Sequence, residues 1–237
     1  MKSLQVLTPA RKCIYNCPFC IAKSHKHHNL FDNNYQQKKD FWEQNYINIL
    51  KSNSDLKTVV ITGTNEPVQD LDYIKDVIKL TRENRPDIKI ELQTRFYKKI
   101  DVFSDLDIVA YSISDFKLLN KIEVVDKGSR YVLILTNTFD NKSLSDILKV
   151  VPVKVNQLTL KVLHDSKGVN PIIDEWIKNN KISEDTVNNI KNDIHSYNGN
   201  RSIIFDENCM EAENRYMVFR EDGLLYKDFD SNNPVNI

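Results

Sequence analysis

The chain has 237 residues, of which 33 are Lys or Arg and 33 are Asp or Glu, so its formal net charge is zero. This balance argues against a protein dedicated to nucleic acid or to a membrane surface, because such proteins carry an excess of basic residues. No apolar run reaches the roughly 18 residues of a membrane span, and no basic segment precedes an apolar leader. We therefore expect a cytoplasmic protein with no membrane partner and no dedicated nucleic-acid partner.

Short β-branched runs alternate with longer segments of helical periodicity along the first two thirds of the chain. The predicted strands are Leu4–Leu7, Thr58–Thr62, Ile88–Gln93, Asp107–Ile113, Tyr131–Thr136 and Gln157–Leu163. The predicted helices are Phe41–Lys51, Leu71–Arg85 and Ser143–Val150, with shorter ones around Tyr97–Phe103 and Asp115–Lys121. Strands that alternate with helices indicate parallel βαβ units. Six such units predict an α/β fold, an open partial (β/α)6 TIM barrel.

The pattern changes after about residue 165. Pro171–Asn179 and Glu184–Tyr197 are predicted polar helices, and Asp222-Gly223 is typical of the turn of a β-hairpin. We expect residues 1–165 to form the barrel core. Residues 166–237 are then a C-terminal extension of helices and a hairpin that covers the barrel mouth.

Three of the four cysteines lie within eight residues, in the sequence Cys13-Ile-Tyr-Asn-Cys17-Pro-Phe-Cys20 directly after the first predicted strand. In a cytosolic protein such a cluster indicates metal or redox chemistry rather than disulfides. Thiolates select iron–sulfur clusters or zinc. Three thiolates on a [4Fe–4S] cluster leave one iron with an open position, where a small molecule can bind.

Structural zinc is the alternative for this loop, with His25, His27 or His28 as the fourth ligand. Zinc sites usually pair two separated cysteine knuckles, and only one occurs in this sequence. Cys209 lies outside the motif, and a buried free thiol is its simplest interpretation. The sequence contains no further cysteine cluster, so auxiliary iron–sulfur clusters are excluded.

A Cys-x3-Cys-x2-Cys loop after the first strand of a partial barrel resembles the radical S-adenosylmethionine (SAM) enzymes. Phe19 precedes the last cysteine, where that family places an aromatic residue near the SAM adenine. The family also has a Gly-Gly-Glu-Pro-like turn after the second strand, and this chain has Ile61-Thr-Gly-Thr-Asn-Glu66-Pro67 there. Thr64 and Asn65 replace the second glycine and add a residue. The resemblance covers about residues 1–165 and implies a [4Fe–4S] cluster on the three cysteines.

The resemblance also implies a SAM site along the ends of the strands. Glu66 would accept hydrogen bonds from the ammonium group of SAM. Gly63 and Thr64 would present backbone groups there, because a small residue permits close approach. Without the cysteines, Glu66 would be interpreted as an ordinary solvated carboxylate of a loop.

Four further residues are weaker candidates for SAM contacts. Thr94, with Gln93 as its neighbour, occupies the place of a Thr-Asn-Gly motif in the family, and the Asn and Gly are absent here. Ser112 and Ser114 lie where similar enzymes contact the ribose hydroxyls. Small hydroxyl residues at strand ends are equally common as structural caps. Lys161, within the last predicted strand, is a further candidate for pairing the SAM carboxylate.

The reaction implied by the resemblance is reductive cleavage of SAM to a 5′-deoxyadenosyl radical, which abstracts a hydrogen atom from the substrate. A flavodoxin- or ferredoxin-like electron donor is implied as a partner. The short chain and closing hairpin resemble nucleotide-modifying members, including viperin-like enzymes, so we expect a small-molecule or nucleotide substrate. A peptide or protein substrate is the alternative. The contrasting class is a non-catalytic zinc-binding interaction module.

A partial barrel leaves one side uncovered, and a primary radical must be kept away from water. Two segments remain to close the site, His25–Tyr35 beside the cysteine loop and Arg201–Asp230 in the extension. We expect both to line the substrate pocket, with Arg215, Tyr216 or Arg220 of the hairpin contributing to binding or closure.

Overall fold

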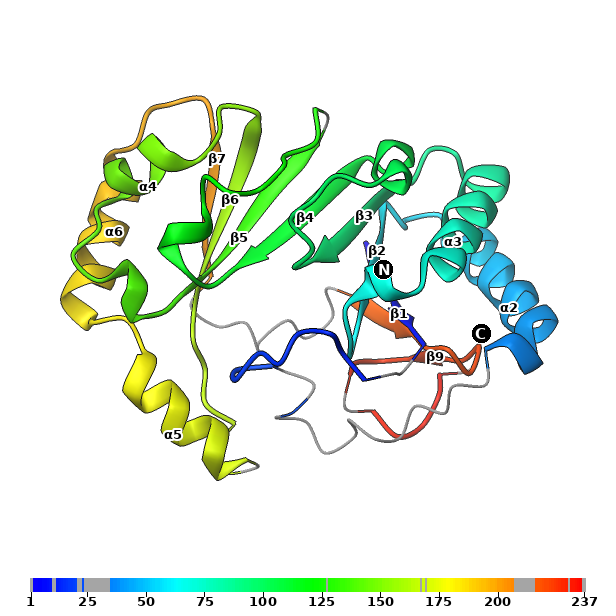
Figure 1. The fold of residues 1–237 in the computed structure, drawn as a ribbon. Helices are drawn as coiled ribbons and strands as arrows, with labels where there is room; N and C mark the ends of the chain where they lie inside the picture. Colours follow the sequence, from blue (N-terminus) through cyan, green and yellow to red (C-terminus); the bar gives the residue numbers. More distant parts are fainter. Residues whose placement is uncertain are drawn as a thin grey trace.

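The structure is a computed structural model that describes residues 2–9, 12–20, 23, 35–126, 128–166, 168, 170–206, 216–229 and 231–235. Within these residues one sheet has nine strands in the order β7-β6-β5-β4-β3-β2-β1-β8-β9 (Figure 1). The strands are β1 (Ser3–Thr8), β2 (Thr58–Gly63), β3 (Lys89–Thr94), β4 (Ile108–Ile113), β5 (Ser129–Leu135), β6 (Val155–Val162), β7 (Ser202–Asp206), β8 (Tyr216–Phe219) and β9 (Leu225–Tyr226).

All neighbouring strands from β7 through β8 run parallel, and only the β8–β9 pair is antiparallel. From β1 to β6 each strand pairs with the one before it in the chain, which winds the sheet in one direction as in a (β/α) barrel. The two edges, β7 and β9, are not paired with each other. The fold is therefore an open partial barrel of the α/β class, as predicted.

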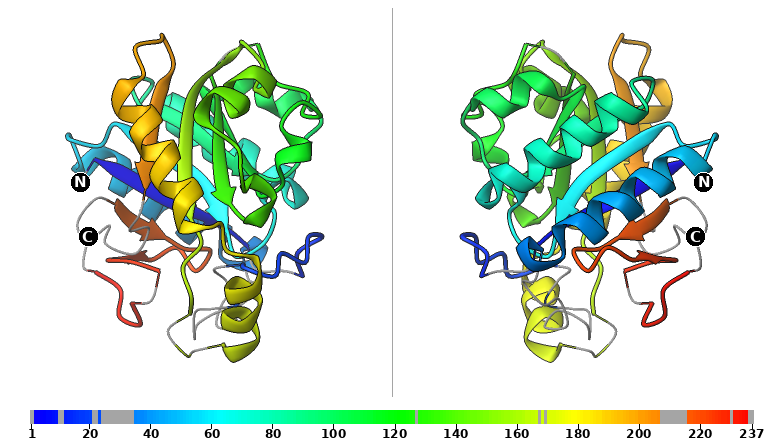
Figure 2. Two further views of the ribbon diagram at one scale, coloured as in Figure 1. Left: turned by 90° about the vertical axis from the view of Figure 1, so that its left-hand side faces the viewer. Right: turned by 90° about the vertical axis from the view of Figure 1, so that its right-hand side faces the viewer.

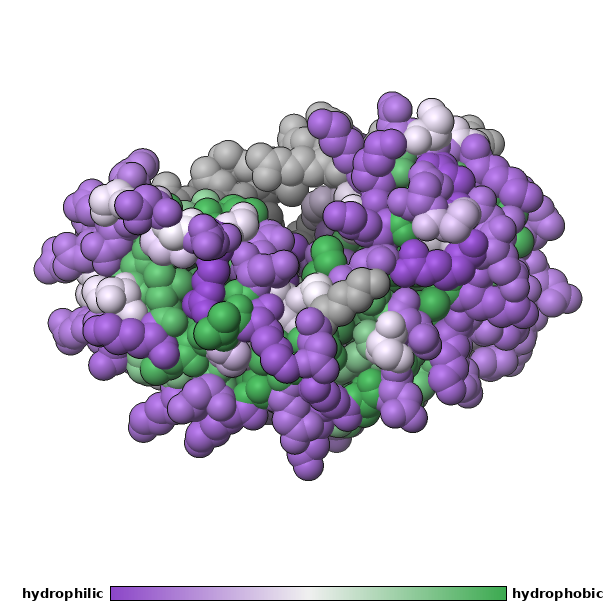
Figure 3. Space-filling view, turned by 90° about the horizontal axis from the view of Figure 1, so that it is seen from above, coloured by the Kyte–Doolittle hydropathy of each residue, from purple (hydrophilic) through white to green (hydrophobic). Residues whose placement is uncertain are grey.

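Most of the helices flank the sheet at its two lateral ends (Figures 1 and 2). The structure has α2 (Lys39–Ser52), α3 (Leu71–Asn84), α4 (Leu144–Val150), α5 (Pro171–Asn180) and α6 (Glu184–Ser196), together with five 3-10 turns among the described residues: η1 (Gln36–Lys38), η2 (Pro67–Gln69), η3 (Asp101–Asp105), η4 (Phe116–Leu118) and η5 (Asn137–Phe139). No described helix is both long enough and apolar enough to cross a lipid bilayer. Seen from above in Figure 3, hydrophilic side chains dominate the periphery, and hydrophobic ones show mainly nearer the middle.

An aromatic cluster packs α2 and α3 against the sheet. Trp42 is fully buried, and its ring lies 5.1 Å from that of Tyr46, 5.1 Å from Tyr73 and 5.2 Å from Phe219. Phe219 belongs to β8, so the C-terminal hairpin contributes to the main core beside the N-terminal strand. Aromatic pairs at these separations contribute beyond the area that they bury.

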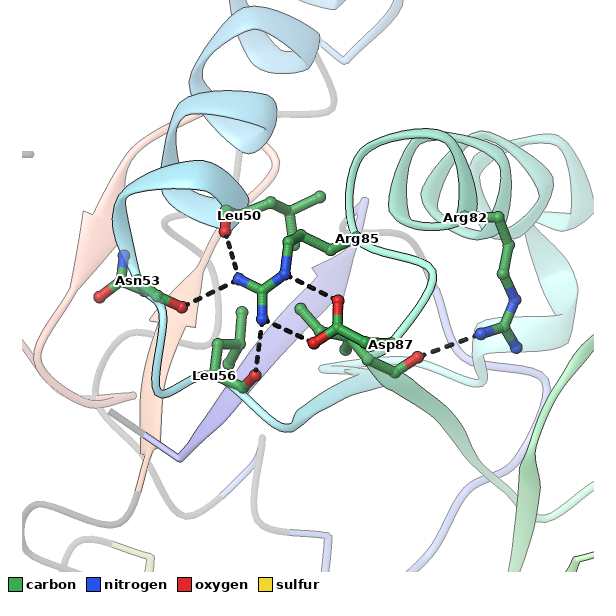
Figure 4. A network of polar contacts seen from close by, with 7 residues as sticks. Leu50, Asn53, Leu56, Arg82, Arg85 and Asp87 are labelled. Carbon is green, nitrogen blue, oxygen red and sulfur yellow. Dashed lines mark hydrogen bonds and ion pairs between the residues drawn. The ribbon is translucent and has the colours of Figure 1, made fainter.

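Arg85 ties the end of α2 to the segments that lead into β2 and β3 (Figure 4). Its guanidinium donates to the carbonyls of Leu50, Asn53 and Leu56 at 3.0, 3.2 and 3.3 Å, and forms two bonds of 2.8 and 2.9 Å with the Asp87 carboxylate. Carbonyls at the end of a helix have no partner within the helix, and Arg85 supplies one.

The six predicted strands are confirmed with shifts of one or two residues at their ends, and the three longer predicted helices of the core are α2, α3 and α4. The segments around 97–103 and 115–121 instead contain only the short turns η3 and η4. β7, which adds to β6 at the sheet edge, was not among the predicted strands. Its residues are only half-buried or exposed, so an apolar strand pattern is weak there. The predicted hairpin is confirmed, with Gly223 at a φ of 79° in its turn.

Candidate functional site

The cysteine loop follows β1 at the C-terminal edge of the sheet, where α/β folds place their ligand sites. Cys13, Cys17 and Cys20 are half-buried, and none of them forms a disulfide. The loop turns at Cys17, whose carbonyl accepts from the N–H of Cys20 at 3.3 Å and from the Nζ of Lys23 at 3.0 Å. Among the described residues, no three Cys, His, Asp or Glu side chains are gathered closely enough to hold a metal ion.

Glu66 lies at the start of η2, shortly after the end of β2, and is 3% exposed. Its Oε1 accepts from the hydroxyl of Thr94 at 2.5 Å and from the N–H of Val68 at 3.4 Å, and its Oε2 accepts from the N–H of Arg95 at 2.8 Å. Burial raises the pKa of the Glu66 carboxyl above its ordinary value, and these hydrogen bonds oppose that rise. The Glu66 carboxylate is thus held near the C-terminal end of β2 by hydrogen bonds that replace its contacts with water.

The extra residue of the Glu66 turn, Asn65, joins the ends of β1 and β2. Its Oδ1 accepts from the Thr8 hydroxyl at 2.9 Å, and its Nδ2 donates to the Pro9 carbonyl at 3.2 Å. Gly63 lies against this pair, and a Cβ there would come within 2.2 Å of the Thr8 Oγ1. A larger residue at this position would force the Thr8 and Asn65 side chains to shift. Thr64 is half-buried.

Arg95, which follows β3, connects Glu66 to the cysteine loop. Its backbone bonds Glu66, while its guanidinium donates to the Cys17 Sγ at 2.8 Å and to the Ser114 Oγ at 3.2 Å. The guanidinium carbon lies 5.7 Å from the centre of the Phe19 ring and 6.0 Å from that of Tyr15. Arg95 was not among the predicted site residues, although it directly follows Thr94, which was.

A pocket of about 280 Å³ opens beside this group. Among the described residues that line this pocket, Arg95 is the one with a formally charged side chain. α5 closes one side through Trp176, whose ring lies 5.5 Å from that of Phe19, and Figure 2 shows α5 at the same end of the molecule as the cysteine loop. The lining residues are Tyr15, Asn16, Cys17, Pro18, Phe19, Arg95, Ser114, Thr136, Asn137, Thr138, Trp176 and Asn180.

The remaining predicted SAM residues are distributed unevenly around the pocket. Phe19 and Ser114 line the pocket. Thr94 is not among the lining residues, but it donates to Glu66, which is hydrogen-bonded to the lining residue Arg95. The Ser112 carbonyl accepts from the Tyr97 hydroxyl at 2.6 Å, and Ser112 is not part of the pocket lining.

Two predicted side chains are engaged by carboxylates of the sheet, Gln93 within β3 and Lys161 across to β7. The Gln93 amide donates to the Glu91 carboxylate at 3.2 Å, and this carboxylate forms an ion pair of 3.2 Å with Arg130. Lys161 forms an ion pair of 3.4 Å with Asp206, its register partner on β7.

The two segments that were expected to close the site are described only in part. His25, His27, His28, Cys209 and Arg215 lie outside the described residues. Tyr216 is half-buried on β8. Arg220 is buried, donates to the carbonyls of Phe229 and Ser231 at 2.8 Å each, and lies 3.6 Å from the centre of the Tyr226 ring. Arg220 thus fastens the C-terminal segment to the hairpin.

No protein-family model matches the chain, and no curated protein matches it in sequence. Solved structures do match it in fold. Native anSMEcpe with bound AdoMet (SAM) and the Cp18Cys peptide superposes with a TM-score of 0.63 at 15% identity, over 98% of this chain and 75% of that one. Native anSMEcpe with bound AdoMet gives 0.62 at 13% identity over 98% and 76%, and a histidine-tagged form of anSMEcpe with bound AdoMet gives 0.62 at 13% over 98% and 75%.

The chain shares the fold of these AdoMet-bound proteins. At identities of 13–15% this likeness establishes the architecture, and it agrees with the partial barrel seen in the strand order. The assignment of residues to a site depends on the contacts of this chain.

Proposed function

We propose that this chain is a radical SAM enzyme, which holds a [4Fe–4S] cluster on Cys13, Cys17 and Cys20 and binds SAM beside it. The observation that carries the proposal is the contact chain from Cys17 through Arg95 to Glu66. It brings the cysteine loop, a cation and a buried carboxylate together at one edge of a sheet. The solved structures of the same fold contain AdoMet.

The cysteine loop suits a cluster better than a zinc ion. Its three thiols come from one loop of eight residues, and thiolates are the ligands of iron–sulfur clusters. The Arg95 guanidinium donates to the Cys17 Sγ, so a positive charge lies beside the position where the cluster would be held. When bound, the cluster supplies the electron that cleaves SAM.

Glu66 and Arg95 are suited to the two charged ends of the amino-acid part of SAM. Glu66 presents a fixed carboxylate to an ammonium group, and Arg95 presents a fork of donors to a carboxylate. The backbone N–H of Arg95 holds the Glu66 carboxylate, and Cys17 and Ser114 hold the Arg95 guanidinium, so both groups are fixed in place. Lys161 is paired with Asp206, so Arg95 replaces it as the proposed carboxylate partner.

The pocket is suited to the nucleoside part of SAM. Phe19 and Trp176 offer aromatic surface for a flat purine ring, and Ser114, Thr136 and Thr138 offer hydroxyls for a ribose. α5 contributes Trp176 and Asn180 to one wall of the pocket, where exclusion of water would serve a radical reaction.

The proposed substrate is a small molecule or a nucleotide, and a peptide or protein is the second candidate. One observation favours the second: a solved structure of this fold holds AdoMet together with the Cp18Cys peptide. A flavodoxin- or ferredoxin-like protein is proposed as the electron donor, and the cytoplasm as the compartment.

The experiment is anaerobic reconstitution with iron and sulfide, followed by iron and acid-labile sulfide analysis and titration with SAM. The expected result is a coloured protein that binds SAM and, on reduction, forms 5′-deoxyadenosine. A colourless protein that holds zinc and does not bind SAM would instead support the zinc-binding module. Hydrogen abstraction is then tested with a nucleotide mixture and with a peptide library in parallel.

A further inference from the structure

The turn that carries Glu66 also holds the loop that carries the cysteines. The amide of Gln69, the last residue of η2, donates from Nε2 to the Lys12 carbonyl at 3.0 Å. Its Oε1 accepts from the N–H of Ile14 at 3.0 Å. Cys13 lies between these two backbone groups, so one side chain spans the first cysteine of the loop from both sides.

These two bonds restrict the backbone of Cys13 in particular. The Lys12 carbonyl belongs to the peptide unit before Cys13, the Ile14 N–H belongs to the unit after it, and each unit is planar. Holding both planes restrains φ and ψ of Cys13 together. Because the direction of the Cβ follows from these angles, Gln69 restrains the direction from which Cys13 presents its thiol.

Gln69 is itself well anchored. The turn η2 begins at Pro67, whose ring fixes φ, and Pro67 is buried. The N–H of Gln69 donates to the Glu66 carbonyl at 3.0 Å, and the N–H of Asp70 donates to the Pro67 carbonyl at 2.9 Å. The amide that holds Cys13 and the Glu66 carboxylate therefore belong to one short rigid turn.

We propose that Gln69 is a positioning residue, which presents Cys13 to the metal cluster and couples the cysteine loop to the Glu66 side of the SAM site. The inference rests on the proposed function, because it takes Cys13 as a cluster ligand. Both bonds are exposed to solvent, so their effect on global stability is small. Their effect on the loop is large, because a ligand that is already oriented loses less conformational freedom when the cluster assembles.

The test compares Gln69→Ala with the matched control Gln44→Ala. The amide of Gln44 donates at 3.1 Å to Asn48 in an exposed hydrogen bond within α2. In metal-free protein, hydrogen exchange of the Ile14 amide is expected to be about 2- to 10-fold faster in Gln69→Ala. The control is expected to show the wild-type rate, and both variants the wild-type urea midpoint.

Cluster retention is the second measurement. After anaerobic reconstitution, Gln69→Ala is expected to lose iron to a chelator faster than wild type and Gln44→Ala do. Gln69→Glu keeps the chain length and the acceptor for the Ile14 N–H, but it places an oxygen against the Lys12 carbonyl. An intermediate rate of iron loss is expected for this variant, which also serves if Gln69→Ala folds poorly.

The outcomes separate this inference from the function on which it rests. Wild-type rates of Ile14 exchange and of iron loss in Gln69→Ala, with a normal cluster in wild type, would overturn the role of Gln69 and leave the proposed function intact. A wild-type protein that assembles no cluster under conditions that load it with zinc would overturn both.

Discussion

The hydroxyl of Thr94 donates a 2.5 Å hydrogen bond to the buried carboxylate of Glu66. Thr94 ends β3 and Glu66 follows β2, so the bond links the C-terminal ends of two adjacent parallel strands. The threonine hydroxyl thereby favours the ionised form of a carboxyl whose pKa is raised by burial. Removing this bond should change the ligand site more than the fold.

Thr94→Val keeps the side-chain shape and removes this hydrogen bond. We expect SAM affinity near neutral pH to fall by about tenfold, because a charge-assisted bond contributes about 1.5 kcal/mol or more. Isothermal titration of the reconstituted protein measures the change. Thr58→Val, at the opposite end of β2, is the control, and equal affinities of the two variants would show that Thr94 does not act on Glu66.

Glu66→Ala is expected to leave the iron content normal and to weaken SAM binding by roughly ten- to a hundredfold, from the loss of one charge-assisted hydrogen bond. In the proposed site of the wild-type protein, the ammonium of SAM would need the ionised carboxylate. Because burial raises the folded-state pKa of Glu66, affinity should decline as pH falls through that raised value. Titrations at several pH values should show this slope in wild type and lose it in Glu66→Gln.

The same pKa shift has the opposite consequence for the stability of the metal-free protein. A carboxyl with a raised folded-state pKa binds its proton more tightly when folded, so its contribution to stability is present below its ordinary pKa. That contribution is lost as pH rises through the folded value. Urea unfolding of Glu66→Gln should therefore show less decline between acidic and neutral pH than wild type shows, and parallel curves would contradict this.

Arg95 and Lys161 are the two candidate partners of the SAM carboxylate in the proposed site. Arg95→Gln should weaken SAM binding by about tenfold or more, because a charged partner is lost, whereas Lys161→Met should leave it unchanged, because Lys161 pairs with Asp206. Iron content is the control for both. A larger loss of SAM affinity in Lys161→Met than in Arg95→Gln would instead assign the SAM carboxylate to Lys161 on β6.

The cysteine ligands are tested by single alanine substitutions. Cys13→Ala, Cys17→Ala and Cys20→Ala should each abolish cluster binding, because the proposed site has three protein thiolates and loses one. Cys209→Ala should retain iron and sulfide at the wild-type ratio. The reverse pattern would show that the ligands have been assigned incorrectly.

Arg85→Ala tests the junction in Figure 4. We expect a loss on the order of 1–3 kcal/mol in the free energy of unfolding, because carbonyls at the end of α2 lose a charged donor. Urea unfolding measures it, and SAM binding should be unaffected. Arg85 also lowers the pKa of Asp87 to about 2, so this pair contributes above the ordinary pKa and its contribution is lost as pH falls toward 2.

The local features of this protein were accessible from its sequence. The alternation of strands and helices predicts the parallel sheet, since periodicity reports which residues are buried. The Cys13–Cys20 spacing identifies the loop, and the Glu66-Pro67 turn is recognisable after β2. The periodicity of each strand or helix, the cysteine spacing and the Glu66-Pro67 turn are all local patterns of consecutive residues. The edge strand β7 was missed because its half-exposed residues carry little of this signal.

The contacts that assemble the site depend on tertiary structure. Arg95 meets Cys17 across 78 positions of the chain, and Trp176 of α5 meets Phe19 from the opposite half of the sequence. Gln69 reaches the peptide units around Cys13 only because η2 and the cysteine loop follow adjacent parallel strands. Residue type and spacing determine which groups are present and on which element. Strand register and helix packing determine which of them meet, because those arrangements result from the burial of the whole core.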